Sequence, residues 1–108
     1  MPTELVGHEE LIRCLYYAQQ IRREYGVTID TAMINDVPGY GWALPPLFIE
    51  AGIPRVAFRA NGIRGQFLWH RPGAVERPFY WEGPAGHRLF VWYTDSYREG
   101  NFFRAAGL

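Results

Sequence analysis

Asp36 is the residue whose type and position are best suited to chemistry. It follows Val27–Ile34, a short run of β-branched and apolar residues that predicts a buried strand. Pro38 and Gly39 have the residue types that the centre of a type II turn requires, so we expect a sharp turn just after Asp36. Because ligand sites in α/β sheets and barrels lie at the carboxyl ends of the parallel strands, Asp36 has the location of a catalytic acid. In the alternative interpretation, Asn35 and Asp36 only bind the amides of the turn.

The other polar residues form no second catalytic motif. The three histidines, His8, His70 and His87, are far apart and lack the spacing that directs two side chains to one metal ion. The glycine-rich stretch Asn61–Gly65 is too short and wrongly spaced to bind a phosphate. Ser96 is the only serine, and no Gly-x-Ser-x-Gly elbow surrounds it. Nucleotide binding and serine-based catalysis are therefore poorly supported.

The elements that must position Asp36 alternate as in a parallel α/β sheet. Apolar residues recur at three- and four-residue steps from Glu9 to Tyr25, which predicts a helix that ends at Gly26. A second helix is expected over Leu44–Ala51, with its prolines in the first turn, and a strand over Ile53–Arg59. This order predicts parallel strands joined by a crossover helix.

The second half of the chain has a different character. Three short aromatic stretches, Phe67–Trp69, Phe79–Trp81 and Leu89–Tyr93, are separated by turn-forming residues. We expect the last two stretches to form a hairpin.

Composition limits the classes of protein and partner. The chain has 108 residues, of which 48% are hydrophobic, enough for one domain at most. Eleven basic and eleven acidic residues balance, and no apolar run approaches the roughly 20 residues of a membrane span. We therefore expect neither nucleic acid nor a membrane as a partner. The single cysteine, Cys14, is expected to be a small buried residue and favours a reducing, cytoplasmic setting.

The segment Asn35–Ile53, NDVPGYGWALPPLFIEAGI, closely resembles a segment of glycoside hydrolase family 38, the alpha-mannosidase type. The aromatic stretch at Phe79–Trp81, the Gly-Pro-Ala-Gly turn and Leu89–Tyr97 resemble a later part of that family's catalytic domain. The resemblance implies an α/β fold, part of a seven-stranded (β/α) barrel of the glycoside hydrolase/deacetylase type, with an aromatic-rich β-hairpin in the second half. Since such a barrel needs about 250 residues, residues 1–108 are expected to be an internal, incomplete segment of the domain.

The resemblance also implies the site. By position, Asp36 takes the role of the family's zinc ligand and nucleophile in the retaining hydrolysis of alpha-mannosidic bonds. Tyr97 corresponds to a tyrosine that contacts the substrate, and Arg59 lies about one place from the family's arginine. No His-x-Asp zinc motif occurs in residues 1–25, and Asp95 does not match the family's acid/base motif. We therefore expect the remaining zinc ligands and the acid/base residue to lie outside this chain, which alone would be inactive.

Three alternatives remain open at this stage. A polysaccharide deacetylase-like barrel would also place a strand-end Asp on a metal, but its Asp-Asp and His-x-x-x-His motifs are absent. A catalytically inactive fragment and an aromatic-rich carbohydrate-binding module are the others. An incomplete barrel would leave sheet edges uncovered, so we also expect association through these edges.

Overall fold

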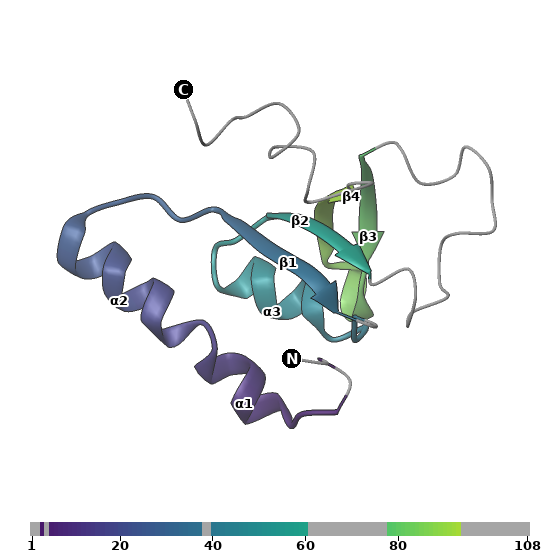
Figure 1. Cartoon of the computed structure of the whole chain (residues 1–108), viewed down its shortest axis with the longest axis horizontal. Helices are drawn as coiled ribbons and strands as arrows, with labels where there is room; N and C mark the ends of the chain where they lie inside the picture. The colour runs from purple at the N-terminus through teal and green to yellow at the C-terminus, as the bar shows by residue number, and fades with distance from the viewer. Residues whose placement is uncertain (1–2, 4, 38–39, 61–77, 94–108) are drawn as a thin grey trace.

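A computed structural model describes residues 3, 5–37, 40–60 and 78–93 of the chain (Figure 1). Within these ranges the chain forms three α-helices, four strands and a short 3-10 turn. In chain order the elements are α1 (His8–Arg13), α2 (Tyr16–Tyr25), β1 (Thr31–Val37), α3 (Leu44–Glu50), β2 (Arg55–Ala60), β3 (Phe79–Glu82), η1 (Pro84–Gly86) and β4 (Arg88–Tyr93). None of the described helices is long and apolar enough to cross a membrane.

The four strands form one open mixed sheet in the order β1-β2-β4-β3. β1 is parallel to β2, and β2 is parallel to β4, whereas β3 pairs with β4 as an antiparallel hairpin. The predicted parallel pair with a crossover helix (β1-α3-β2) and the predicted hairpin are therefore confirmed.

The expected seven-stranded barrel architecture is wrong. The described residues form a small open sheet with an antiparallel edge strand. The reason is the short β3–β4 connection: a (β/α) barrel needs a helix after each strand, whereas a tight hairpin necessarily reverses the chain and makes β3 antiparallel.

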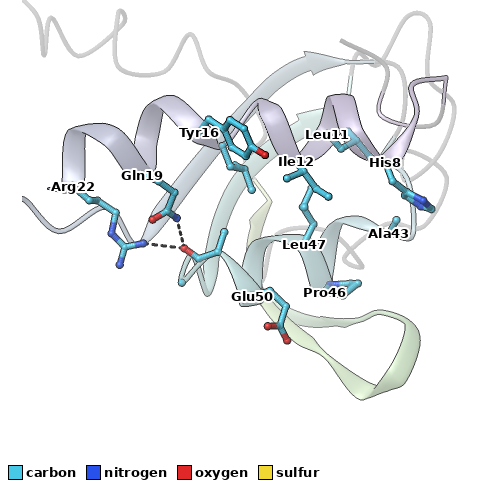
Figure 2. A pocket seen from close by; sticks show the side chains of 13 residues that line it. His8, Leu11, Ile12, Tyr16, Gln19, Arg22, Ala43, Pro46, Leu47 and Glu50 are labelled. Atoms are coloured by element: carbon cyan, nitrogen blue, oxygen red, sulfur yellow. Dashed lines mark hydrogen bonds between the residues drawn. The ribbon is translucent and has the colours of Figure 1, made fainter. Parts of the chain in front are cut away.

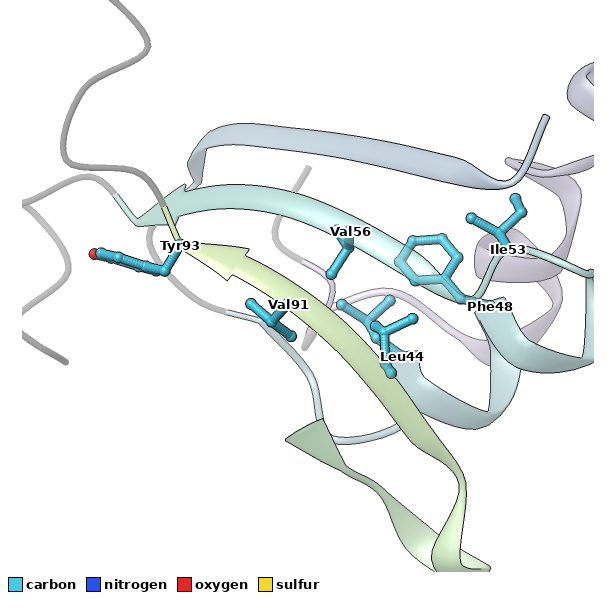
Figure 3. Close-up of a cluster of buried hydrophobic side chains, with 7 residues drawn as sticks. Leu44, Phe48, Ile53, Val56, Val91 and Tyr93 are labelled. Carbon is cyan, nitrogen blue, oxygen red and sulfur yellow. The ribbon is translucent and has the colours of Figure 1, made fainter. Parts of the chain in front are cut away.

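Helix α3 covers one face of the sheet and forms the core with it. Leu89 and Val91 of β4 are completely buried on this face, whereas Arg88 and Trp92, which alternate with them, are exposed. The alternation follows from the two-residue period of a strand. The core side chains come from α3, β2, β4 and the loop before β2 (Figure 3): Leu44, Phe48, Ile53, Val56, Leu89, Val91 and Tyr93.

The outer face of the sheet carries exposed apolar side chains. Met33, Ala57 and Trp92 occupy one row across β1, β2 and β4, and Met33 and Trp92 are 70% and 55% exposed. Tyr80 of β3 is 59% exposed; its ring contacts Phe90 edge-on, and the Arg88 guanidinium lies 4.7 Å from its centroid. The described part of the chain does not bury this face.

The N-terminal helical region differs from the prediction in two respects. The single helix expected over Glu9–Tyr25 is broken by a turn at Cys14–Leu15 into α1 and α2. Cys14 is exposed, not buried as expected, because this region packs only through part of its apolar stripe: Leu11 is buried and Leu15 half-buried. The predicted end of the helix is confirmed, since Gly26 takes the left-handed conformation (φ 64°) that closes α2.

The observed boundaries of the first strand also differ from the predicted ones. The first strand, expected over Val27–Ile34, begins at Thr31 and continues through Val37. Val27 is exposed, so this apolar residue is not part of a buried strand. The predicted strand Phe67–Trp69 and the Pro38-Gly39 turn lie outside the described residues.

Candidate active site at the carboxyl edge of the parallel strands

Asp36 lies near the carboxyl end of β1, at an irregularity in its pairing with β2. Asn35 is the partner of Arg59 and Val37 is the partner of Ala60, so two steps along β1 correspond to one along β2. Asp36 is therefore the extra residue of a β-bulge. Bulges redirect a side chain relative to the regular alternation and are common beside active sites. The backbone position of Asp36 agrees with the prediction; its side chain lies outside the described part of the structure.

Parallel pairing brings a second predicted residue to the same edge. Arg59 of β2 pairs with Asn35, the residue before Asp36. Arg59 and Asn35 therefore lie on neighbouring strands, which are typically about 4.8 Å apart. Tyr93, at the end of β4, reaches the same edge through its pairing with Phe58. Tyr97 and the side chain of Arg59 are outside the described residues. Their roles as substrate contacts remain predictions.

The chain after Asp36 is held by two hydrogen bonds. The Tyr40 hydroxyl donates to the Ile34 carbonyl oxygen at 3.3 Å. The Gly41 amide donates to Oγ1 of Thr3 at 2.7 Å, and Thr3 is only 8% exposed. Sequence reasoning missed both residues. Tyr40 could have been considered because it lies within the family-like segment, whereas nothing near Thr3 in the sequence points to Gly41.

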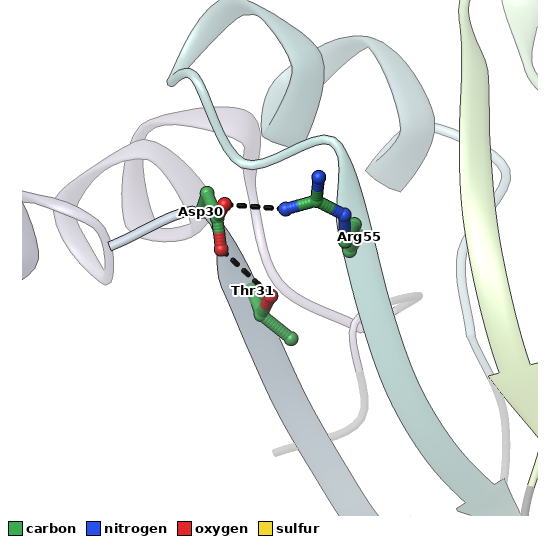
Figure 4. A network of polar contacts seen from close by, with 3 residues as sticks. All are labelled: Asp30, Thr31 and Arg55. Carbon is green, nitrogen blue, oxygen red and sulfur yellow. Dashed lines mark hydrogen bonds and ion pairs between the residues drawn. The ribbon is translucent and has the colours of Figure 1, made fainter. Parts of the chain in front are cut away.

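A different polar group lies at the amino ends of β1 and β2, at the opposite end of the strands from Asp36 (Figure 4). Asp30, directly before β1, accepts a hydrogen bond from the Thr31 hydroxyl at 2.9 Å and pairs with the Arg55 guanidinium at the start of β2. These two interactions, the Thr31 hydrogen bond first, lower the pKa of the Asp30 carboxyl. At about 3.3 Å per residue along a strand, Asp30 and Asp36 are roughly 20 Å apart. Asp30 is therefore too far away to act with Asp36 on one glycosidic bond.

His87 connects the hairpin to α3. Its Nδ1 lies 3.1 Å from the Pro84 carbonyl oxygen and its Nε2 lies 3.1 Å from Glu50 Oε1. Both ring nitrogens face acceptors, which favours the imidazolium form. The Pro84 carbonyl, and then Glu50, raise the pKa of His87 above its usual value. Among the residues that the structure describes, no cluster of metal ligands surrounds this histidine.

No metal site is complete within the described residues. No group of three or more His, Cys, Asp or Glu side chains in these ranges could hold a metal ion. His8 is an exposed residue at the start of α1, and His70 falls outside the described ranges. The expectation that the histidines of this chain form no metal motif stays a prediction.

A hollow of about 830 Å³ lies between α1–α2 and α3, and apolar side chains form most of its lining (Figure 2). At one end, Gln19 Nε2 and Arg22 donate to the Ala51 carbonyl oxygen at 2.7 and 2.9 Å, which ties α2 to the end of α3. The described lining residues come from α1, α2, α3 and the chain directly beside these helices.

Comparison with known proteins supports the assignment suggested by the Asp36 segment. No match was found among the curated proteins. The sequence model of the family described as "Glycosyl hydrolases family 38 N-terminal domain" matches residues 2–105, a range that includes Asp36, Arg59 and Tyr97. Since this match covers nearly all of the 108 residues, the chain belongs to the glycosyl hydrolase family 38 N-terminal domain family.

Proposed function

We propose that this chain provides the nucleophile segment of a retaining, zinc-dependent glycoside hydrolase that cleaves alpha-mannosidic bonds. Membership of glycosyl hydrolase family 38 supports the class of enzyme. The observation that carries the residue assignment is the location of Asp36 at a bulge near the carboxyl end of a parallel strand. Arg59, on the neighbouring strand, is the proposed second contact to the sugar, and Tyr97 the third.

The proposed chemistry needs an ionised carboxylate. Asp36 would attack the anomeric carbon of the mannoside, forming a carbon–oxygen bond while the glycosidic bond breaks. The departing oxygen takes a proton from a separate acid, and water then hydrolyses the glycosyl ester to restore Asp36. A retaining mechanism places the two carboxyl groups about 5 Å apart. Asp30 is too distant, so we propose that the acid lies outside the described residues.

Zinc fits this segment only in part. A zinc site generally takes about four ligands from protein and water, and the described residues contain no cluster able to supply them. We propose that Asp36 contributes one ligand and that the others come from elsewhere in the complete protein. Bound zinc would favour the ionised form of the carboxylate.

An aryl alpha-mannoside assay with added zinc tests this proposal. It should compare the 108-residue chain with a longer protein that contains it, each with and without Asp36→Asn. We expect turnover only by the longer protein and loss of that turnover in its Asp36→Asn variant. Turnover by the short chain would refute the proposal that essential groups lie elsewhere, and an active Asp36→Asn variant would refute the nucleophile assignment.

Carbohydrate binding without catalysis is a second candidate, favoured by the aromatic outer face. Trp92 and Tyr80 are exposed, and an aromatic ring offers a flat apolar surface that a sugar ring can contact. Titration with manno-oligosaccharides, followed by tryptophan fluorescence, would show binding that Trp92→Ala abolishes. Tyr17→Ala, which removes an exposed ring from α2, serves as the control. No change in fluorescence on titration would rule out this candidate.

A further inference from the structure

Tyr40 forms a hydrogen bond across the stretch of chain that contains Asp36. Its hydroxyl donates to the carbonyl oxygen of Ile34, two residues before Asp36, although Tyr40 itself comes four residues after it. The ring is half-buried, and the residue lies on the path from β1 to α3. The hydrogen bond therefore links the two sides of the segment that contains Asp36.

Thr3, near the start of the sequence, binds Gly41, the residue after Tyr40. Its buried hydroxyl oxygen accepts the Gly41 amide at 2.7 Å, and it is the one polar residue buried among those that the structure describes. The approach is close because position 41 has no side chain: a Cβ there would lie 3.3 Å from the Thr3 carbonyl oxygen. An N-terminal residue thus anchors the segment that leaves the carboxyl edge of the sheet.

We infer that Tyr40 and Thr3 are positioning residues for Asp36, because they hold the described chain on its C-terminal side. The inference rests on the proposed function of Asp36. A bulge alone does not fix a side chain, because one residue is left without a ladder partner. One local hydrogen bond, from Tyr40 to Ile34, and one long-range hydrogen bond, from Gly41 to Thr3, restrain the chain within five residues of Asp36. Neither side chain needs to contact the substrate.

The test uses the 108-residue chain and conservative substitutions. Tyr40→Phe removes only the hydroxyl, Thr3→Val replaces the hydroxyl with a methyl group, and Thr3→Ser retains it. Tyr17→Phe, at an exposed ring on α2, is the matched control for Tyr40→Phe. NMR would follow amide hydrogen exchange at Gly41 and the chemical shift of the Asp36 backbone amide, with the Val91 amide as a reporter of global stability.

We expect Thr3→Val to accelerate Gly41 exchange about five- to tenfold, as expected for the loss of one hydrogen bond, without a matching change at Val91. Tyr40→Phe and Thr3→Val should both shift the Asp36 amide signal, whereas Thr3→Ser and Tyr17→Phe should preserve it. In a longer, active enzyme, the first two variants should lower kcat about five- to tenfold with little change in KM.

The results separate this inference from the proposed function. An Asp36 amide signal that is identical in all the variants, or an equal loss of protection at Gly41 and Val91, would overturn the positioning role even if Asp36→Asn abolished turnover. Conversely, altered Asp36 signals combined with an active Asp36→Asn enzyme would refute the catalytic assignment and leave only local ordering by Tyr40 and Thr3.

Discussion

Replacing Gly83 by alanine tests how the β3–β4 hairpin docks on α3. Gly83 is buried and has ordinary extended backbone angles (φ −95°, ψ −172°), so alanine adds no backbone strain. Its new Cβ would lie 2.8 Å from Pro45 Cβ, 2.9 Å from Pro46 Cδ and 3.0 Å from Pro45 Cγ. These separations are well below the roughly 3.5–4.0 Å of favourable carbon–carbon contact, and proline rings cannot rotate away.

We expect Gly83→Ala to lower the free energy of unfolding by about 1–3 kcal/mol, the usual cost of overpacking. For a chain of this size that corresponds to a fall in Tm of about 4 °C or more. Thermal and urea unfolding followed by circular dichroism would measure it. Gly7→Ala is the control, because the close neighbour of its new Cβ is the carboxylate end of the flexible, exposed Glu10. Equal stability of the Gly83→Ala variant and wild type would refute the docking of the hairpin on Pro45 and Pro46.

Three further predictions concern the same layer of the fold. Leu89→Ala should cost about 2–5 kcal/mol in urea unfolding, because the side chain is completely buried; a cost below about 1 kcal/mol would contradict the core. Since the folded pKa of His87 is raised, its contribution to stability is fully present below about pH 6.5 and is lost as pH rises through the folded pKa. The Tm of wild type should therefore fall between pH 6 and 8 relative to that of His87→Gln, and parallel pH profiles would exclude the Glu50 pairing. Ala85→Gly should be neutral or slightly stabilising, because Ala85 is in the left-handed region (φ 60°); a loss of about 1 kcal/mol on thermal unfolding would contradict that conformation.

Elements with strong local signals could be predicted from the sequence. The prolines in the first turn of α3, the glycine after α2 and the turn-forming residues between β3 and β4 act through backbone geometry within a few residues. The parallel pairing of β1 with β2 also followed, because a helix between two strands returns the chain to the same end of the sheet.

The architecture of the sheet could not be derived in this way. The position of β4 between β2 and β3 depends on tertiary pairing, and no local residue type sets the direction of β4 relative to β2. The exposed face of β4 could not be read from its residue types, because RLFVWY continues with apolar residues after Arg88, although Trp92 is exposed. The break at Cys14–Leu15 could not be predicted either, because no proline or glycine occurs there.

The backbone location of Asp36 could be predicted from the sequence, whereas the local pairing and contacts around it could not. Asp36 was placed at a strand end by the residues on either side of it. The bulge was not foreseen, because it arises from the register between β1 and β2. Thr3 was also missed, since its partner Gly41 is distant in the sequence. The roles of Asp36, Arg59 and Tyr97 remain predictions.

Trapping the covalent intermediate tests the central claim most directly. A fluorinated mannosyl fluoride, which forms the glycosyl ester but slows its hydrolysis, would be incubated with a longer active protein containing this chain, and the labelled peptide would be identified by mass spectrometry. We predict one mannosyl label on Asp36, and no label on that peptide in the Asp36→Asn variant. A label on another carboxylate, with Asp36 unmodified, would contradict the assignment of the nucleophile.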